Sequence, residues 1–181
     1  MATYIALVRG INIGGHKKTA MADLRELLMR MEFEDTQSLL NSGNLVFRSK
    51  TLATGNLEQR LEVEAKKRLS LESPFFVRTT QEWQSIIAHN PFPEEAERDP
   101  SHLAVMFFKS APEPGAVKAL QKIITGPEVI RAEGRQAYII YPDGFARTRL
   151  TNALIDSKLG TTGTGRNWNT VLKLAAIFSK H

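Results

Sequence analysis

Cysteine is absent from this chain of 181 residues, and no hydrophobic run approaches the roughly 18 apolar residues that span a bilayer. Without cysteine there is no disulfide framework, no thiolate nucleophile and no cysteine-based zinc site. The apolar run at the start, residues 3–9, lacks a basic leader and is too short for a secretory signal, so we expect a first strand there. These features favour a cytoplasmic protein without a membrane partner.

Acidic residues are scarce at the C-terminal end. Residues 144–181 contain six lysines or arginines and one acid, Asp156, so this end carries the whole net charge of +5. The chain has 24 basic and 19 acidic residues in all, and residues 1–143 therefore hold 18 of each. A neutral body with one basic, polar end favours an anionic partner.

The remaining composition is that of an ordinary folded protein. Hydrophobic residues make up 42% and charged residues 24% of the chain, which excludes the disordered and collagen-like classes. The length allows one domain or two small ones.

Hydrophobic periodicity predicts a β-α-β-β-α-β order in the first part of the chain. Strands are predicted at 3–9, 36–41, 45–48 and 75–78, and helices at 21–31 and from Asn56 to about residue 69. Thr19 is expected to cap the first helix, and Asn56 with Gln59 the second. Ser42 and Gly43 are expected to form a tight hairpin turn. This order is the split βαβ pattern of a ferredoxin-like domain.

A second, incomplete cycle is predicted after a connecting segment. Thr79 and Glu82 predict a capping box for a helix that ends before Pro91, and the acidic residues 94–100 are expected to be a solvated linker. Strands follow at 103–108, 128–132 and 136–141, helices at 113–124 and 149–158, and, in place of a last strand, a closing helix from near Asn167 with Trp168, Val171, Leu172, Ala175 and Phe178 on its apolar face. We therefore expect an α+β protein of two tandem ferredoxin-like (split βαβ) subdomains, 1–80 and 101–181, joined by residues 81–100.

A loop rich in hydrogen-bond donors, residues 9–18, follows the first predicted strand. In a ferredoxin-like sheet, this loop and the turn at residues 41–44 lie at the same edge. Glycine lets backbone N–H groups approach a ligand, and the next helix adds a favourable dipole, although turn formation alone also explains these glycines. The candidate ligand-binding residues here are Arg9, Gly10, Asn12, Gly14, Gly15, Lys17, Ser42 and Asn44.

A second candidate site lies in the basic end, where the binding residues are Arg166, Asn167, Asn169, Thr170 and Lys173. Positive charge in the first turn of a helix is unfavourable unless an anion lies there. Asn167 has the alternative role of an N-cap, and Trp168 is expected to be a core residue rather than a platform for base stacking. We expect this motif and the first loop to form one anion site, with Arg9 on one side and Arg166 on the other.

The usual catalytic and metal-binding patterns are missing. Gly10 and Gly15 have the spacing of a P-loop, but His16 stands where that motif has lysine, which disfavours a nucleoside triphosphatase. His16 is either an acid–base group or a solvent-exposed loop residue. The histidines have no metal-ligand spacing, and no hydrolase or metalloprotease motif is present. We predict no metal and no cofactor, and the sequence leaves open whether the protein is an enzyme.

Four segments carry a resemblance to a known family: Tyr4–Gly15, Met21–Leu24, Ser42–Phe47 and Arg166–Thr170. Together they closely resemble the bacterial family called domain of unknown function 1697, and the resemblance runs essentially end to end. It implies a compact α+β protein of two related subdomains. It brings no established activity, substrate or cofactor.

Several functions compete at this point. The favoured one is binding of a small phosphorylated or otherwise anionic ligand such as a nucleotide. The alternatives are an RNA-binding protein, an enzyme acting on an anionic metabolite oriented by Arg9, Asn12 and Arg166, and an adaptor that binds proteins through its basic end. The strands offer no string of aromatic residues on one face, which disfavours an RNA-recognition module. The sequence does not predict the oligomeric state.

Overall fold

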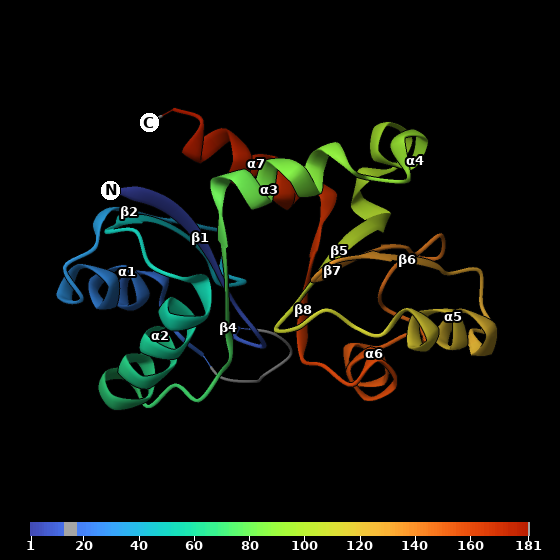
Figure 1. Ribbon diagram of the computed structural model, residues 1–181, viewed down its shortest axis with the longest axis horizontal. Helices are drawn as coiled ribbons and strands as arrows, with labels where there is room; N and C mark the ends of the chain where they lie inside the picture. Colours follow the sequence, from blue (N-terminus) through green and yellow to red (C-terminus); the bar gives the residue numbers. More distant parts are fainter. Residues whose placement is uncertain (13–17, 181) are drawn as a thin grey trace. The chain divides into compact units, whose positions relative to one another are not determined.

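The computed structural model describes residues 1–12 and 18–180 (Figure 1). Two β-α-β-β-α-β cycles follow each other along the chain. The first consists of β1 (Ala2–Val8), α1 (Met21–Arg30), β2 (Glu34–Leu39), β3 (Asn44–Ser49), α2 (Thr54–Leu69) and β4 (Phe75–Thr79). The second consists of β5 (Leu103–Phe108), α5 (Pro114–Ile123), β6 (Val129–Glu133), β7 (Gln136–Ile140), α6 (Asn152–Leu159) and β8 (Gly163–Asn167).

Additional helices connect and end the two cycles. Between them lie α3 (Thr80–Ala88), α4 (Pro93–Arg98) and the short 3₁₀ helix η1 (Pro100–His102), and after β8 comes α7 (Trp168–Phe178). The chain forms two compact units, one of residues Met1–Ser85 with the C-terminal segment from Leu174, the other of Ile86–Lys173. None of the described helices is long and apolar enough to cross a membrane.

Each cycle forms one antiparallel sheet of four strands, in the order β2-β3-β1-β4 and β6-β7-β5-β8. Counted within its own cycle, each sheet has the same strand order, with the first strand between the third and the fourth. This is the ferredoxin-like arrangement, and it confirms the predicted α+β fold. Figure 1 shows α1 and α2 on one side of the first sheet, and α5 and α6 on one side of the second.

The core of the first unit lies between its sheet and these two helices. Alternate residues of β1 point into it, because side chains on a strand alternate between the two faces. The buried cluster includes Tyr4, Ala6 and Val8 of β1, Leu24, Leu27 and Leu28 of α1, Leu57, Leu61 and Ala65 of α2, and Leu45, Phe47, Phe75 and Val77 of the neighbouring strands. The intervening residues Ile5 and Leu7 are also buried. Apolar side chains therefore follow one another without interruption along this part of β1.

The second unit repeats this construction. Ala104, Met106 and Phe108 of β5 pack with Ala137 and Ile139 of β7, Leu120 of α5 and Ile155 and Leu159 of α6. Val105 and Phe107, which alternate with them, are buried as well. Both first strands therefore carry apolar residues on both faces.

The prediction that the second cycle lacks its last strand is wrong. Residues 163–167 form β8, which pairs with β5 along its whole length. Its sequence, Gly-Thr-Gly-Arg-Asn, has low β propensity, so the strand has no local signal. The glycines have a packing reason, because a Cβ on Gly163 would lie 2.7 Å from Phe108 Cδ1 and one on Gly165 would lie 2.8 Å from Met106 Sδ.

Several helix boundaries also differ from the predictions. The expected solvated linker at 94–100 is largely the helix α4. The N-cap of α1 is Ala20 rather than Thr19, and that of α2 is Ala53 rather than Asn56. On α7, Leu172 is exposed rather than on the buried face.

The predicted capping box of α3 is confirmed. The Thr79 N–H donates to Glu82 Oε2 over 2.8 Å, and the Glu82 N–H donates to Thr79 Oγ1 over 3.0 Å. These two bonds satisfy backbone donors at the start of the helix and fix the direction in which the chain leaves β4.

Candidate functional site

The first candidate site is built around the side-chain amide of Asn12. Its Nδ2 donates to the carbonyl oxygens of Thr19 and Asn41, each over 2.8 Å, and its Oδ1 accepts the Thr19 N–H over 2.8 Å. Asn12 has a left-handed backbone with φ 55°, which asparagine tolerates better than most residues. One amide therefore connects the loop after β1, the approach to α1 and the turn between β2 and β3.

Gly43 brings that turn close to the end of β1. The Val8 N–H donates to the Gly43 oxygen over 2.9 Å. Gly43 has φ +86°, and a Cβ there would lie 2.9 Å from both Ile11 Cδ1 and Val8 Cβ. Only glycine satisfies both the backbone angle and this contact. For the described part of the first loop, up to Asn12, the predicted convergence with the hairpin turn is confirmed.

The polar residues of the turn stabilise its backbone. Asn44 Nδ2 donates to the Leu39 oxygen over 2.8 Å and to Ser42 Oγ over 2.9 Å, and Asn44 itself is fully buried.

The Arg9 N–H donates to the Pro74 oxygen over 3.2 Å, which ties the end of β1 to the residue before β4. Gly10 has φ +69°, and, apart from Gly10 itself and its two chain neighbours, no atom of the described residues lies within 4 Å of the position that a Cβ would take there.

A shallow hollow of about 630 Å³ adjoins this loop at the start of α1. It is lined by Asn12, Lys18, Thr19, Ala20, Met21, Asp23 and Asn41. The N-cap residue Ala20 offers no side chain to the first N–H groups of the helix. The hollow thus combines an exposed lysine with a helix N-terminus that has no side-chain cap. Gly14, Gly15, His16 and Lys17 lie outside the described residues.

The second candidate motif has a different character, because Arg166 is buried in β8. Its Nη1 donates to Thr164 Oγ1 and to the Gly165 oxygen, each over 2.8 Å. Burial lowers the pKa of the Arg166 guanidinium to about 10. Arg166 is 8% exposed, so the Thr164 hydroxyl and the Gly165 carbonyl replace part of the water that would otherwise solvate its charge.

The residues after Arg166 begin α7. Asn167 Oδ1 accepts the Thr170 N–H over 3.0 Å, so the interpretation of Asn167 as an N-cap is confirmed. Thr170 is buried, Asn169 is half-buried and Lys173 is exposed. Trp168 is 5% exposed, which agrees with a core role. Arg9 and Arg166 belong to different compact units, and the idea that they share an anion stays a prediction.

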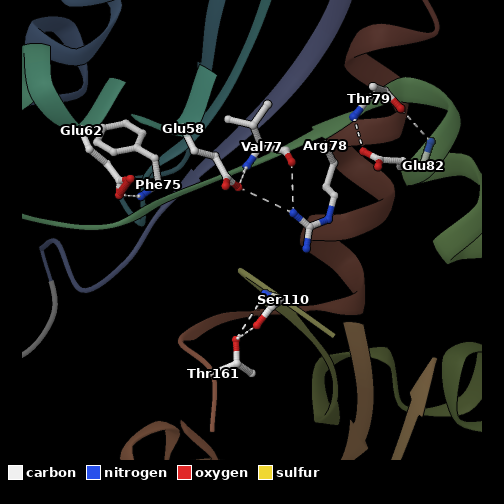
Figure 2. Close-up of polar contacts among 9 residues, drawn as sticks. All are labelled: Glu58, Glu62, Phe75, Val77, Arg78, Thr79, Glu82, Ser110 and Thr161. Atoms are coloured by element: carbon white, nitrogen blue, oxygen red, sulfur yellow. Dashed lines mark hydrogen bonds and ion pairs between the residues drawn. The ribbon is translucent and has the colours of Figure 1, made fainter. Parts of the chain in front are cut away.

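A buried ion pair in the first unit was not predicted (Figure 2). Glu58 Oε2 on α2 accepts the Val77 N–H over 2.8 Å and lies 3.8 Å from Arg78 Nη1. Arg78 also donates to the Val77 oxygen over 3.0 Å. The sequence held a signal: Arg78 follows the apolar residues Phe75–Val77 in the same strand, and Glu58 lies between Leu57 and Leu61 on the helix that carries the apolar stripe.

The described residues contain no group of three or more histidines, aspartates or glutamates placed to hold a metal ion. His102 Nδ1 lies 2.8 Å from Asp99 Oδ2 at the end of α4, and His89 Nδ1 lies 3.5 Å from Glu133 Oε1. Each of these is a pair at the surface of the second unit.

Comparison with known proteins identifies the family. The chain belongs to the family described as protein of unknown function (DUF1697), whose model matches residues 1–138. The match includes Asn12 and the β2–β3 turn and ends before β8. The solved structure of the conserved bacterial protein SP0830 from Streptococcus pneumoniae is similar over 97% of each chain, with a TM-score of 0.73 and 24% identity, which shows the fold alone. A search of curated proteins gave no match.

Proposed function

We propose that this member of the family binds a small anionic ligand, such as the phosphate group of a nucleotide, in the hollow at the start of α1. The observation that carries the proposal is the Asn12 amide, which holds Thr19 and Asn41 together beside the helix terminus. Because Asn12 already holds Thr19 and Asn41 together without a ligand, binding costs little ordering of these two segments.

The charge distribution of the hollow supports an anion. A helix N-terminus carries a partial positive charge, and its first N–H groups are ready donors for phosphate or carboxylate. The N-terminus of α1 lies in the wall of the hollow, because Ala20 and Met21 line it, and Lys18 adds a full positive charge. Asp23 contributes a negative charge to the same wall. The Asn12 amide is already engaged by its hydrogen bonds to Thr19 and Asn41. The groups that contact the ligand are therefore the first backbone N–H groups of α1 and the ammonium group of Lys18.

RNA is the weaker alternative. RNA-recognition modules stack bases on aromatic residues of the open sheet face. Among the described residues, Phe145 is the one exposed aromatic side chain, and it lies in the segment between β7 and α6. A small ligand needs no such platform.

A thermal-shift screen of nucleotides, sugar phosphates and short RNA oligomers tests the proposal. A ligand that binds the folded state raises the melting temperature in a saturable way. We expect stabilisation by one class of small phosphorylated compound. Stabilisation by RNA alone, with a steep loss of affinity as salt increases, would indicate the nucleic-acid alternative.

Three single variants then locate the site. Lys18→Ala should weaken binding of the compound found by the screen about tenfold, a change of about 1.4 kcal/mol. Asp23→Asn should strengthen it, because the change removes a negative charge from the wall. Lys50→Ala is the matched control, since Lys50 is an exposed lysine of the same unit outside the hollow. Equal effects of Lys18→Ala and Lys50→Ala would place the ligand elsewhere.

A further inference from the structure

A second cavity, of about 590 Å³, lies in the other compact unit. Its apolar wall includes Ile124 after α5, Pro127 before β6, Leu150 before α6 and Leu154 within α6. Arg147 and Arg149 line it as well. The volume lies within the range of sites for small molecules, about 300–1,000 Å³.

The two arginines have no partner among the described residues: neither forms a hydrogen bond or an ion pair with another residue of that part of the chain. The segment that carries them is nevertheless held in place. Thr148, between them, donates its hydroxyl to Glu128 Oε1 over 2.7 Å, and Thr148 Oγ1 accepts the Leu150 N–H over 3.1 Å. An ordered backbone thus presents two guanidinium groups whose charges the fold does not neutralise.

The two acids that line the cavity, Glu128 and Asp143, do not neutralise the arginines. Glu128 is buried, accepts a hydrogen bond from the Thr148 hydroxyl and packs its carboxylate against Gly126. Asp143 is exposed at the cavity and forms no ion pair with either arginine. A guanidinium matches a carboxylate or phosphate with two parallel hydrogen bonds, which gives both energy and orientation.

We propose that this cavity binds an amphipathic anion. Its apolar body packs against Leu150, Leu154 and Ile124, and its carboxylate, phosphate or sulfonate pairs with Arg147 and Arg149. The apolar wall and the two unneutralised arginines lie in one cavity. A ligand that has both an apolar body and a negative charge accounts for this combination. This site is separate from the hollow at α1 and does not depend on the function proposed above.

The test uses 8-anilinonaphthalene-1-sulfonate, which has an apolar ring system and one sulfonate and fluoresces strongly in apolar surroundings. We expect saturable binding of one molecule per chain. The double variant Arg147→Ala/Arg149→Ala should weaken it by about tenfold or more, since it removes both guanidinium groups that pair with the sulfonate. Asp143→Asn should strengthen it. Lys118→Ala, which removes an exposed lysine of α5 outside the cavity, should leave it unchanged.

Two further measurements separate the apolar and ionic parts. N-phenyl-1-naphthylamine has the same rings without the sulfonate, so it should bind more weakly and should not respond to the arginine variants. Leu154→Trp fills the cavity and should reduce binding of both probes, while circular dichroism confirms that the variant is folded. An unchanged affinity of the sulfonate probe in the double arginine variant, or in folded Leu154→Trp protein, would overturn the proposal.

Discussion

Arg78 and Arg166 occupy equivalent positions in the two sheets. Arg78 in β4 is paired with Ile5 of β1, and Arg166 in β8 is paired with Val105 of β5. Both arginines are buried. Each precedes a residue that caps the next helix, Thr79 before α3 and Asn167 before α7. The repetition of the fold therefore extends to single residues at this junction.

The equivalence continues at the ends of the first strands. The Val8 and Arg9 N–H groups donate to Gly43 and Pro74, and the Phe108 and Lys109 N–H groups donate to Arg135 and Thr162 in the same way. A basic residue, Arg9 or Lys109, thus follows the first strand of each unit. Ser110, one residue further on, donates to Thr161 Oγ1 over 3.0 Å (Figure 2), so in the second unit a hydroxyl pair reinforces that junction.

The first prediction concerns the buried pair of Arg78 and Glu58. Arg78→Met should destabilise the protein by about 3–5 kcal/mol, because it leaves the buried carboxylate without its cation. Adding Glu58→Gln should recover part of this loss, since glutamine keeps an acceptor for the Val77 N–H. Urea denaturation measures both. Arg30→Ala, which breaks an exposed pair with Glu26, is the control and should cost below about 1 kcal/mol. If Arg78→Met and Arg30→Ala lower the free energy of unfolding equally, the explanation by a buried ion pair is contradicted.

The second prediction concerns the glycines of β8. Gly163→Ala should cost about 1–3 kcal/mol, because its methyl group would collide with the ring of Phe108 and come within 3.1 Å of the Phe107 oxygen. Gly165→Ala should cost less, since it meets the flexible end of Met106. Gly115→Ala in α5 has open space and should be neutral or stabilising. Melting temperatures of the three variants provide the ranking, and a Gly163→Ala protein as stable as Gly115→Ala would argue against the packing explanation.

The hydrophobic pattern predicted most strands because their side chains are apolar where the sheet is covered. Leu103–Phe108 is an example, since its uninterrupted apolar run matches β5. β8 escaped prediction because its order comes from pairing with β5 and from the fit of its glycines under Phe108 and Met106. A single sequence does not show which distant side chain requires a glycine.

The candidate sites were predictable to different degrees. The meeting of the first loop and the hairpin turn followed from ferredoxin-like topology alone. The role of Asn12 did not, because its hydrogen bonds to Thr19 and Asn41 depend on a left-handed backbone that propensity does not indicate. The burial of Arg166 was also hidden, since it follows from a strand that the sequence did not reveal.

The third prediction tests the Asn12 amide. Asn12→Ala should destabilise the protein by about 1 kcal/mol, the usual net contribution of a hydrogen bond whose groups water can reach, and it adds strain at a left-handed residue. Asn12→Gly removes the same bonds without that strain and should cost less. Hydrogen exchange of the Thr19 amide should accelerate in both variants, because Asn12 Oδ1 is its acceptor. Unchanged exchange at Thr19 would contradict the role assigned to Asn12.

The fourth prediction concerns alkaline pH. Burial, with a smaller contribution from Glu133, raises the pKa of Tyr138 well above its usual value, and burial with Glu128 does the same for Tyr141. A tyrosine in the unfolded chain has a pKa of about 10, so the unfolded state loses these protons first. The stability that they contribute is complete below about pH 10 and is lost as the pH rises further.

Arg166 acts in the opposite direction, because its lowered pKa of about 10 makes the folded state lose that proton first. Two tyrosines oppose one arginine, so we expect a net fall in the free energy of unfolding above pH 10. The variant Tyr138→Phe/Tyr141→Phe should show a smaller fall in urea denaturation at pH 9 to 11.5. It should also be less stable at pH 8, where it lacks the 2.6 Å bond from the Tyr138 hydroxyl to the Ile86 oxygen. A fall as steep as that of the unmodified protein would exclude these tyrosines as its cause.

The fifth prediction concerns Trp168, the first residue of α7. Its ring is 5% exposed, and truncation of a buried aromatic residue typically costs about 3–5 kcal/mol, so Trp168→Ala should lower stability by that amount. Leu172→Ala is the matched control, because Leu172 is a large apolar residue of the same helix that is 42% exposed, and it should cost below about 1 kcal/mol. Trp168→Phe should fall between the two. If Trp168→Ala leaves the melting temperature unchanged, the ring contributes little to the core and a stacking role becomes the better explanation of its position beside Asn167.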